Sequence, residues 1–520
     1  MDHGNQTAAE PNILTPTGVF AEPVEITVDD VRKQLTKLKV NKAAGPDGVK
    51  PKTLRVCADQ LCGIFHTLFS MSLSLCKIPA TWKTSCIVPV PKKTNVTCLN
   101  DLRPVALTSQ IMKVFERLFL STLKVQVAGF QDPLQFAYRA KIGVDDALLY
   151  MLHSVYSHLE KGSSFVRIMF FDFSSAFNTI QPHLLARKLH NMHLHPSTVS
   201  WIHDYLTDRP QHVRLQNNNT VAKSKQSHTT NRNADTTNTH TVKSPNTTHT
   251  FSNTIYTSTG APQGTVLSPF LFTLYTADCR MSCETCHLQK FSDDSAVVGC
   301  ITGEDESMYR ESITQFIDWC ESNFLVLNVS KTKEMVVDFR RKKSPVQPIM
   351  MKGEPIEMVD DYKYLGVVLD NKLNWASHAD LVYKKIQTRL FFLRKLKSFH
   401  VCNRMLTMFY DSILCSVLMF AAVCWGGNAS ARDISRLNKL IKKASSTVGQ
   451  SLDKFEVVLE RRRAKKFKSI LQYPEHPLHD TLAGLRSSFS SRFSMPKCKT
   501  ERFRRSFVPS AIRYANSLKA

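Results

Sequence analysis

Acidic residues beside apolar stretches are the first features of this sequence that could do chemistry. Asp172 ends an apolar run over residues 165–173 (FVRIMFFDF), and Asp293 and Asp294 interrupt the apolar segment QKFSDDSAVVG. An acidic side chain in such a run is costly unless a cation pairs with it. Mg²⁺ prefers carboxylate oxygens and keeps several waters, so two or three converging aspartates suffice to bind it. The three aspartates therefore suit metal-assisted nucleotidyl transfer, which uses two divalent cations.

Two adjacent aspartates are by themselves a weak signal. Further Asp-Asp pairs occur at 29–30, 145–146 and 360–361. Asp293 and Asp294 differ because their flanks predict a strand, a two-acid turn and a second strand over 288–298. Asp172 has two interpretations: it either binds metal or caps the helix that follows the strand.

The elements expected around these residues form a mixed chain of helices and strands. Apolar spacing predicts helices at 27–40, with Thr27 and Asp30 as a capping box, 109–124, 183–206 with a break near Pro196, and 308–320. Short apolar or alternating runs predict strands at 86–90, 165–173, 325–329, 334–339 and 362–369. From residue 377 onward the chain is expected to be helical and basic, with one buried helix near 413–425.

The composition favours a globular protein with a polyanionic partner. The hydrophobic fraction is 42%, enough for a core, and 68 Lys and Arg against 44 Asp and Glu give a net charge of +24. Such a charge favours nucleic acid, because each neutralised phosphate releases counterions. The 14 cysteines follow no disulfide rhythm, no secretory segment opens the chain, and the apolar stretch 413–425 is too short to span a bilayer. We expect a location in the nucleus or cytoplasm, neither secreted nor in a membrane.

One internal segment has a different composition. Residues 217–250 are dominated by Asn, Thr, Ser and His and contain almost no large apolar residues. A segment of this kind cannot bury a core, so we expect a disordered insertion.

Eight motifs in order resemble one family. They are AAGPDGV (43–49), LRPVALTSQIMKVFERL (102–118), QFAYRAKIGVDDAL (135–148), FFDFSSAFNTI (170–180), TGAPQGTVLSP (259–269), FSDD (291–294), LNVSKTKEMVVDF (327–339) and YKYLGVVLD (362–370). Together they resemble the non-LTR (LINE-type) retrotransposon reverse transcriptases, over roughly residues 35–425. Each motif is a modest signal, whereas the ordered set is very specific.

The resemblance implies roles for individual residues. Asp172, Asp293 and Asp294 match the catalytic, metal-binding triad, and Lys331 matches the lysine near the leaving pyrophosphate. The residues that match nucleotide-binding positions are Lys92, Arg103, Phe177, Gln263 and Gly264, where Phe177 would exclude a 2′-hydroxyl. Tyr364, Leu365 and Gly366 match the primer grip. On the residues alone, Phe177 could be core, Arg103 a surface ion pair and Gly366 a turn.

The implied fold is α+β, a right-hand polymerase with fingers, palm and thumb, an antiparallel palm sheet and a helical C-terminal region. The expected organisation is a lead-in at 1–35, fingers at 36–125, a palm at 126–376 interrupted by the insertion at 217–250, thumb-like helices at 377–450 and a basic region at 451–520. In that last region Phe467, Phe503 and Phe507 alternate with basic residues. This pattern suits a nucleic-acid surface or, alternatively, an amphipathic solvated helix.

The implied reaction is extension of a DNA primer or target end on an RNA template, with deoxynucleoside triphosphates and two Mg²⁺ ions. Ser292 stands where the family usually has Ala. Members of the family carry an endonuclease upstream, and we expect this chain to be the polymerase portion without it, with a separate endonuclease as a candidate partner. The main alternative is a catalytically inactive, RNA-binding remnant of a retrotransposon. An RNA-dependent RNA polymerase is disfavoured by the bulky Phe177, and a group II intron maturase by the fit of the LINE-type motifs.

Overall fold

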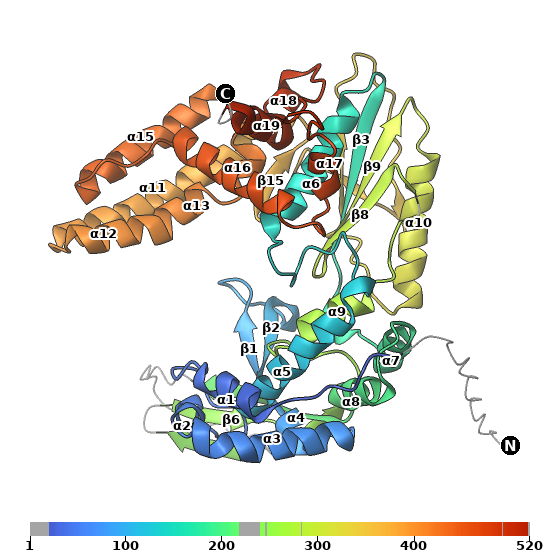
Figure 1. Ribbon diagram of the computed structural model, residues 1–520, viewed down its shortest axis with the longest axis vertical. Coiled ribbons are helices and arrows are strands. Elements are labelled where there is room, and N and C mark those ends of the chain that lie inside the picture. The colour runs from blue at the N-terminus through green and yellow to red at the C-terminus, as the bar shows by residue number, and fades with distance from the viewer. Residues whose placement is uncertain (1–19, 218–239, 245–246, 282, 491, 518–520) are drawn as a thin grey trace, which may run out of the picture. The chain divides into compact units, whose positions relative to one another are not determined.

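The computed structural model describes residues 20–217, 240–244, 247–281, 283–490 and 492–517 (Figure 1). The chain forms two compact units, one from residues 1–131 and 177–275 and the other from 132–176 and 276–520. They are named unit 1 and unit 2 here. Each unit has its own sheet and its own buried core.

Unit 1 packs helices against a mixed sheet. Its helices are α1 (Val28–Thr36), α2 (Pro51–Val56), α3 (Ala58–Ser74), α4 (Ala80–Lys83), α5 (Gln110–Gln126), α7 (Pro182–Asn191), α8 (Pro196–Leu206) and α9 (Ser268–Tyr275), with short 3₁₀ turns at Leu99–Asp101, Ala128–Phe130 and Ala176–Asn178. Its strands are β1 (Ser85–Pro91), β2 (Leu102–Thr108), β4 (Arg209–Asn217), β5 (His240–Ser244), β6 (Thr247–Phe251) and β7 (Ile255–Thr257). The sheet order is β2-β1-β4-β6-β5, and β7 also pairs with β4.

The core of unit 1 is built on stacked aromatic rings. Phe69 of α3 stacks on Phe115 of α5 with ring centroids 4.4 Å apart, and Phe119 stacks on Trp201 of α8 at 4.1 Å. All four side chains are buried. Helix α5 begins where the sequence predicts, because the hydroxyl of Ser109 accepts hydrogen bonds from the first free backbone N–H groups of the helix.

The expectation of a wholly disordered insertion at 217–250 needs correction. Strands β5 and β6 pair antiparallel, and β6 pairs with β4. The segment has few large apolar residues but many threonines, and β-branched residues favour strands. Residues 218–239 and 245–246 lie outside the described part of the chain.

Unit 2 contains a sheet in the order β13-β10-β3-β9-β8. Its strands are β3 (Ser164–Phe171), β8 (Cys286–Phe291), β9 (Asp294–Thr302), β10 (Lys333–Val337), β11 (Met350–Met351), β12 (Glu354–Pro355), β13 (Glu357–Met358), β14 (Asp361–Tyr364) and β15 (Val367–Asp370). The pairs β10–β3, β3–β9 and β9–β8 are antiparallel, whereas β10–β13 is parallel. Every residue of β3 is buried, as its continuous apolar run predicts.

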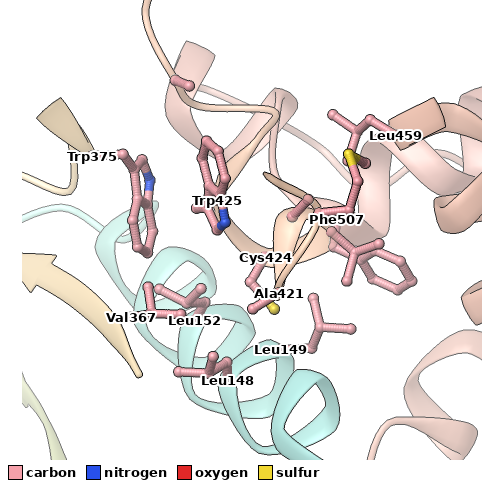
Figure 2. Close-up of a cluster of buried hydrophobic side chains, with 14 of the residues drawn as sticks. Leu148, Leu149, Leu152, Val367, Trp375, Ala421, Cys424, Trp425, Leu459 and Phe507 are labelled. Atoms are coloured by element: carbon pink, nitrogen blue, oxygen red, sulfur yellow. The ribbon is translucent and has the colours of Figure 1, made fainter. Parts of the chain in front are cut away.

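The helices of unit 2 cover this sheet and form its C-terminal region. They are α6 (Val144–Leu159), α10 (Ser307–Ser322), α11 (Ala376–Ser398), α12 (Asn403–Phe409), α13 (Ser416–Leu418), α14 (Ala422–Trp425), α15 (Ala431–Val448), α16 (Phe455–Leu471), α17 (His479–Ala483), α18 (Glu501–Arg504) and α19 (Phe507–Ser517), with a π-helical turn at Tyr410–Cys415. Leu148, Leu149 and Leu152 of α6 belong to the same cluster as Trp375 and Trp425 (Figure 2). This shared core joins the C-terminal helices to the sheet.

Three local predictions differ from the structure. Residues 325–329 form no strand, and only Leu327 bridges to Phe173. The single strand expected over 362–369 is a hairpin, β14–β15. The helix expected near 413–425 is broken at Ala421, whose positive φ of 48° ends one helical segment before α14 begins.

Among the described residues, no helix is long and apolar enough to cross a membrane. All 14 cysteines lie in the described ranges and are free thiols, in agreement with the absence of a disulfide rhythm in the sequence.

Candidate catalytic site

The three predicted catalytic aspartates of unit 2 lie at one end of its sheet. Strands β3 and β9 are antiparallel, with Phe171 opposite Ser295. Asp172 directly follows Phe171, and Asp294 directly precedes Ser295 as the first residue of β9. Asp293 occupies the two-residue turn between β8 and β9. The register therefore brings acids 121 or more positions apart in the sequence to the same sheet edge.

Residues of the QFAYRAK segment hold this acidic turn in place. Ser292 adopts a left-handed conformation, with φ of 62°, and its N–H donates to Oε1 of Gln135 at 3.0 Å. Its hydroxyl lies 3.0 Å from the hydroxyl of Tyr138. Just before the turn, the buried ammonium of Lys290 pairs with Asp132 at 2.8 Å and donates to two carbonyls at 2.6 and 2.7 Å. These supporting contacts link distant segments, and the sequence motifs alone did not reveal them.

The electrostatics of the acids show that they interact. The pKa of Asp294 is raised to about 6, first by lost hydration and then by repulsion from Asp293 and Asp172. Lost hydration is also the first cause of the raised pKa of Asp293. Asp293 and Asp294 are nevertheless exposed residues. Neighbouring protein displaces only part of their water.

This acidic set fits a divalent cation in its chemistry. Oδ2 of Asp172 is buried and accepts no hydrogen bond among the described residues, and its ion-pair partner there is Lys331. A divalent cation would add a strong partner for this oxygen and reduce the repulsion among the acids. Within the described ranges no group of three or more His, Cys, Asp or Glu side chains lies close enough together to hold a metal ion as it stands.

Lys331 lies beside the first catalytic aspartate. Its ammonium is 3.4 Å from Oδ2 of Asp172, and Asn328 donates its N–H to the carbonyl of Asp172 at 2.9 Å. Lys333, the competing candidate two positions later, instead pairs with Glu357 at 2.6 Å. The structure therefore places Lys331, and not Lys333, near the acids.

The predicted primer-grip residues form the turn of the β14–β15 hairpin. Leu365 and Gly366 have φ values of 46° and 87°, which suit a tight two-residue hairpin turn. Tyr364 is buried, and its hydroxyl accepts a hydrogen bond from Gln289 of β8 at 3.0 Å. Its ring lies 5.2 Å from that of Phe170 on β3. The hairpin is thus fixed to the strands that carry the acids.

A buried ion pair network braces the same sheet. Arg167 of β3 donates through two nitrogens to Glu334 of β10, at 2.8 and 2.7 Å, and through a third to Glu306 at 2.6 Å. The hydroxyl of Tyr309 also donates to Glu334, at 2.7 Å. Arg167 and Glu334 are both fully buried. Sequence reasoning missed this network, since the partners are 167 positions apart.

In unit 1, the predicted nucleotide-binding residues Gln263 and Gly264 lie on a loop held against β2. Ala106 of β2 donates its N–H to the carbonyl of Gln263 at 2.7 Å. Gly264 has φ of 112°, and a Cβ there would lie 2.8 Å from the carbonyl oxygen of Ala106. Only glycine suits this conformation and this close approach.

Glu116 of α5 holds the other side of that loop. Its carboxylate accepts hydrogen bonds from the N–H groups of Val266 and Leu267, at 2.5 and 3.0 Å, and from the hydroxyl of Tyr205 at 3.3 Å. Glu116 is fully buried, and burial raises its pKa to about 7. The sequence analysis missed this residue, although a charged side chain on the apolar face of an expected helix was the available signal.

The remaining nucleotide-binding candidates also belong to unit 1. Arg103 is exposed on β2 opposite Val90, and Lys92 is exposed just beyond β1. Phe177 is half-buried, with its ring 5.0 Å from that of Phe272 on α9. The predicted site residues thus fall into two groups, the acids, Lys331 and the primer-grip hairpin in unit 2 and the nucleotide-binding candidates in unit 1.

Comparisons with known proteins identify the family of the chain. Residues 90–369, more than half of the chain, match the family described as "Reverse transcriptase (RNA-dependent DNA polymerase)". The chain belongs to the reverse transcriptase family. A much shorter stretch, residues 375–416, matches "Alkylated DNA repair protein alkB homolog 8, N-terminal". In this reverse transcriptase that stretch covers α11, α12 and the whole π-helical turn.

Similar curated proteins come from mobile elements of flies. The chain is 23% identical over 380 residues to "RNA-directed DNA polymerase from mobile element jockey" of Drosophila melanogaster, covering 70% of this chain and 37% of that protein. It is 21% identical over 462 residues to "Probable RNA-directed DNA polymerase from transposon BS" of the same species, covering 84% and 46%. The chain therefore spans less than half the length of these relatives. The non-LTR retrotransposon resemblance is confirmed.

Phe467, Phe503 and Phe507 of the basic C-terminal region are all buried. The exposed part of α16 and α18 therefore includes basic side chains, such as Arg461, Lys465 and Arg504, and not these rings. Both predicted roles of the region, a nucleic-acid surface and an amphipathic solvated helix, stay predictions.

Proposed function

We propose that the chain extends a DNA primer on an RNA template, as an RNA-directed DNA polymerase derived from a retrotransposon. The observation that carries this proposal is the placement of Asp172 and Asp294 at the same edge of the unit 2 sheet, with Asp293 in the adjoining turn. Two-metal nucleotidyl transfer needs such a set of acids on rigid strands. The fingers, palm and thumb arrangement is part of the same proposal.

The acids and the lysine have separate roles in this reaction. Asp172, Asp293 and Asp294 would hold two Mg²⁺ ions, which supply activation of the primer hydroxyl and neutralisation of the triphosphate. Lys331 is 3.4 Å from Asp172 and offers a mobile ammonium, which can protonate or neutralise the leaving pyrophosphate. Gln135 and Tyr138 keep the acidic turn in its left-handed conformation.

The unit 1 residues are proposed to bind the incoming nucleotide. Arg103 offers a planar fork to the triphosphate and Lys92 a point charge. Gly264 allows the loop backbone to approach the base pair, and Gln263 contacts the nucleotide. Phe177 rejects a 2′-hydroxyl by bulk, which favours deoxynucleotides.

The remaining assignments complete the proposal. Tyr364, Leu365 and Gly366 position the primer end, since their hairpin is fixed to the strands that carry the acids. The partners are an RNA template, a DNA primer or target end, and an endonuclease that acts in the same process. A nuclear or cytoplasmic site of action is consistent with this chemistry.

The proposal is tested by primer extension on poly(rA)/oligo(dT) with Mg²⁺ and dTTP. The purified chain should extend the primer, and the double variant Asp293→Asn, Asp294→Asn should not. The matched control is Asp360→Asn, Asp361→Asn, which removes the same charge from another, exposed Asp-Asp pair. This control should retain wild-type extension.

A second candidate function is that of an inactive RNA-binding remnant, favoured by the excess of 68 basic over 44 acidic residues. This function predicts salt-dependent RNA binding without extension by any variant. Extension lost equally in both double variants would contradict the assignment of the acids, because the loss would then follow total charge and not position.

A further inference from the structure

Unit 1 contains a cavity whose lining residues, apart from Gln263, have no role in the proposed reaction. Its volume is about 780 Å³, and it is lined by residues of β1, β2, β4 and β7 and by residues 259–263. Ser85 and Ile87 on β1 line it beside their parallel neighbours Gln211 and Val213 on β4, and His212, between those two, lines it as well. The cavity is therefore a built concavity beside the Gln263 loop.

One charged side chain in this wall is buried with incomplete hydrogen bonding. Arg209 of β4 is only 6% exposed, and its Nη2 donates to the carbonyl of Thr259 at 2.6 Å. Its Nε and Nη1 have no hydrogen-bond partner among the described residues. Burial lowers the pKa of Arg209, and the phenol of Tyr205 is the group that opposes this effect.

The cavity wall contains nothing that neutralises this guanidinium. The lining residues include no aspartate or glutamate, whereas they offer the amides of Asn178, Asn253 and Gln263 and the hydroxyls of Ser252 and Thr257. A buried charge is normally paired, because leaving it unpaired costs several kcal/mol. An anionic ligand in the cavity would supply the missing counter-charge, and the planar guanidinium matches a phosphate in particular.

We propose that this cavity is a phosphate-binding subsite for the RNA template, with Arg209 as its anchor. The inference rests on the proposed polymerase function for the identity of the strand. A template backbone and a nucleotide both offer phosphate, so the position of the triphosphate candidate Arg103 decides between them. Pro104 of β2 lines the cavity, and the adjacent Arg103, opposite Val90 in the ladder, points to the other face of β2. The cavity therefore lies away from the triphosphate candidate, which favours the template.

The test compares Arg209→Met with wild type in binding a single-stranded RNA oligonucleotide, measured by fluorescence anisotropy at several salt concentrations without nucleotide. Loss of a charged hydrogen-bonding partner predicts an affinity about tenfold lower. The slope of log affinity against log salt should fall by about 0.7, the value for one phosphate of a single strand. The melting temperature should stay equal or rise, because an uncompensated buried charge has been removed.

Arg214→Met is the matched control. Arg214 is on the same strand and is not among the residues that line the cavity. It removes an equal charge, and we expect less than about a threefold change in affinity, typical of a charge without a buried contact.

Three results would overturn the proposal. One is RNA binding by Arg209→Met that equals wild type in affinity and salt slope. A second is an effect confined to the KM for dTTP, which would assign the cavity to the triphosphate. The third is failure of both Arg209→Met and Arg209→Gln to fold, which would make Arg209 a structural residue.

The binding assay does not depend on catalysis. An inactive wild type would therefore refute the polymerase proposal while the RNA-binding test could still be carried out.

Discussion

The Gly264→Ala substitution gives the sharpest prediction about the nucleotide-binding loop. Gly264 has φ of 112°, and its added Cβ would lie 2.8 Å from the carbonyl oxygen of Ala106. The strained backbone costs about 1–3 kcal/mol. The steric overlap costs about another 1–3 kcal/mol, because the opposing atom is backbone and cannot rotate away. If the loop stays in place, stability falls by about 2–6 kcal/mol.

The loop has one way to escape this cost, which is to move away from β2. That movement breaks the hydrogen bond from Ala106 to Gln263, so a variant that remains stable should bind nucleotide poorly. The assays are urea unfolding and steady-state primer extension with varied dTTP. We expect either a loss of stability in the stated range or a KM for dTTP raised at least tenfold.

Gly63→Ala is the control for this prediction. Gly63 is exposed within α3, and a Cβ there meets no atom within 4 Å. Alanine in a helix interior is favoured over glycine by about 1 kcal/mol, so Gly63→Ala should be slightly stabilising and fully active. If Gly264→Ala matches Gly63→Ala in both stability and KM, the argument from backbone conformation and close approach is refuted.

Three further predictions concern buried charge and metal. The pKa of Glu116 is about 7 in the folded protein against 4.5 ordinarily, so the folded state binds this proton more tightly than the unfolded state. The resulting contribution to the free energy of unfolding is complete below pH 4.5 and is lost as the pH rises through 7. The loss is roughly 3 kcal/mol in the free energy of unfolding, measured by urea titration at several pH values. Glu116→Gln should not show this loss, and a pH dependence equal to that of wild type would contradict the burial argument. Arg167→Met leaves Glu334 unpaired and should cost about 3–5 kcal/mol in urea unfolding, while a loss below 1 kcal/mol would show that the pair is not isolated from water. Mg²⁺ should raise the melting temperature of wild type but not of Asp293→Asn, Asp294→Asn, and equal shifts would place the ion elsewhere.

The local elements around the acids were predictable from the sequence. The apolar run that ends at Asp172 predicted β3, and two apolar stretches around Asp293 and Asp294 predicted the β8–β9 hairpin. Both predictions rely on patterns within about ten residues, where periodicity and turn chemistry decide the structure. Ordered motifs then added the family, which the comparisons confirm.

The supporting contacts were not predictable, because they join distant segments. Glu116 reaches Val266 across 150 positions, and Arg167 reaches Glu334 across 167. In neither pair does the local sequence around one residue predict which distant residue it contacts. The expected strand at 325–329 failed for a related reason: Leu325 and Leu327 are buried as expected, but the backbone forms only one isolated bridge, from Leu327 to Phe173.

The insertion illustrates a different limit. Low hydrophobicity suggested that no part of residues 217–250 would be ordered, whereas β5 and β6 pair through their backbones. Backbone pairing needs no large apolar side chain when neighbouring strands supply partners and the residues favour extended conformations. Composition alone therefore did not predict the strands β5 and β6.

The most direct test of the account is copying of a heteropolymeric RNA template of defined sequence, with the product sequenced. The account predicts full complementary DNA from wild type and from Asp360→Asn, Asp361→Asn, and none from Asp293→Asn, Asp294→Asn. No complementary DNA from wild type, while it still binds the RNA in a salt-dependent manner, would contradict the polymerase assignment and support the RNA-binding remnant.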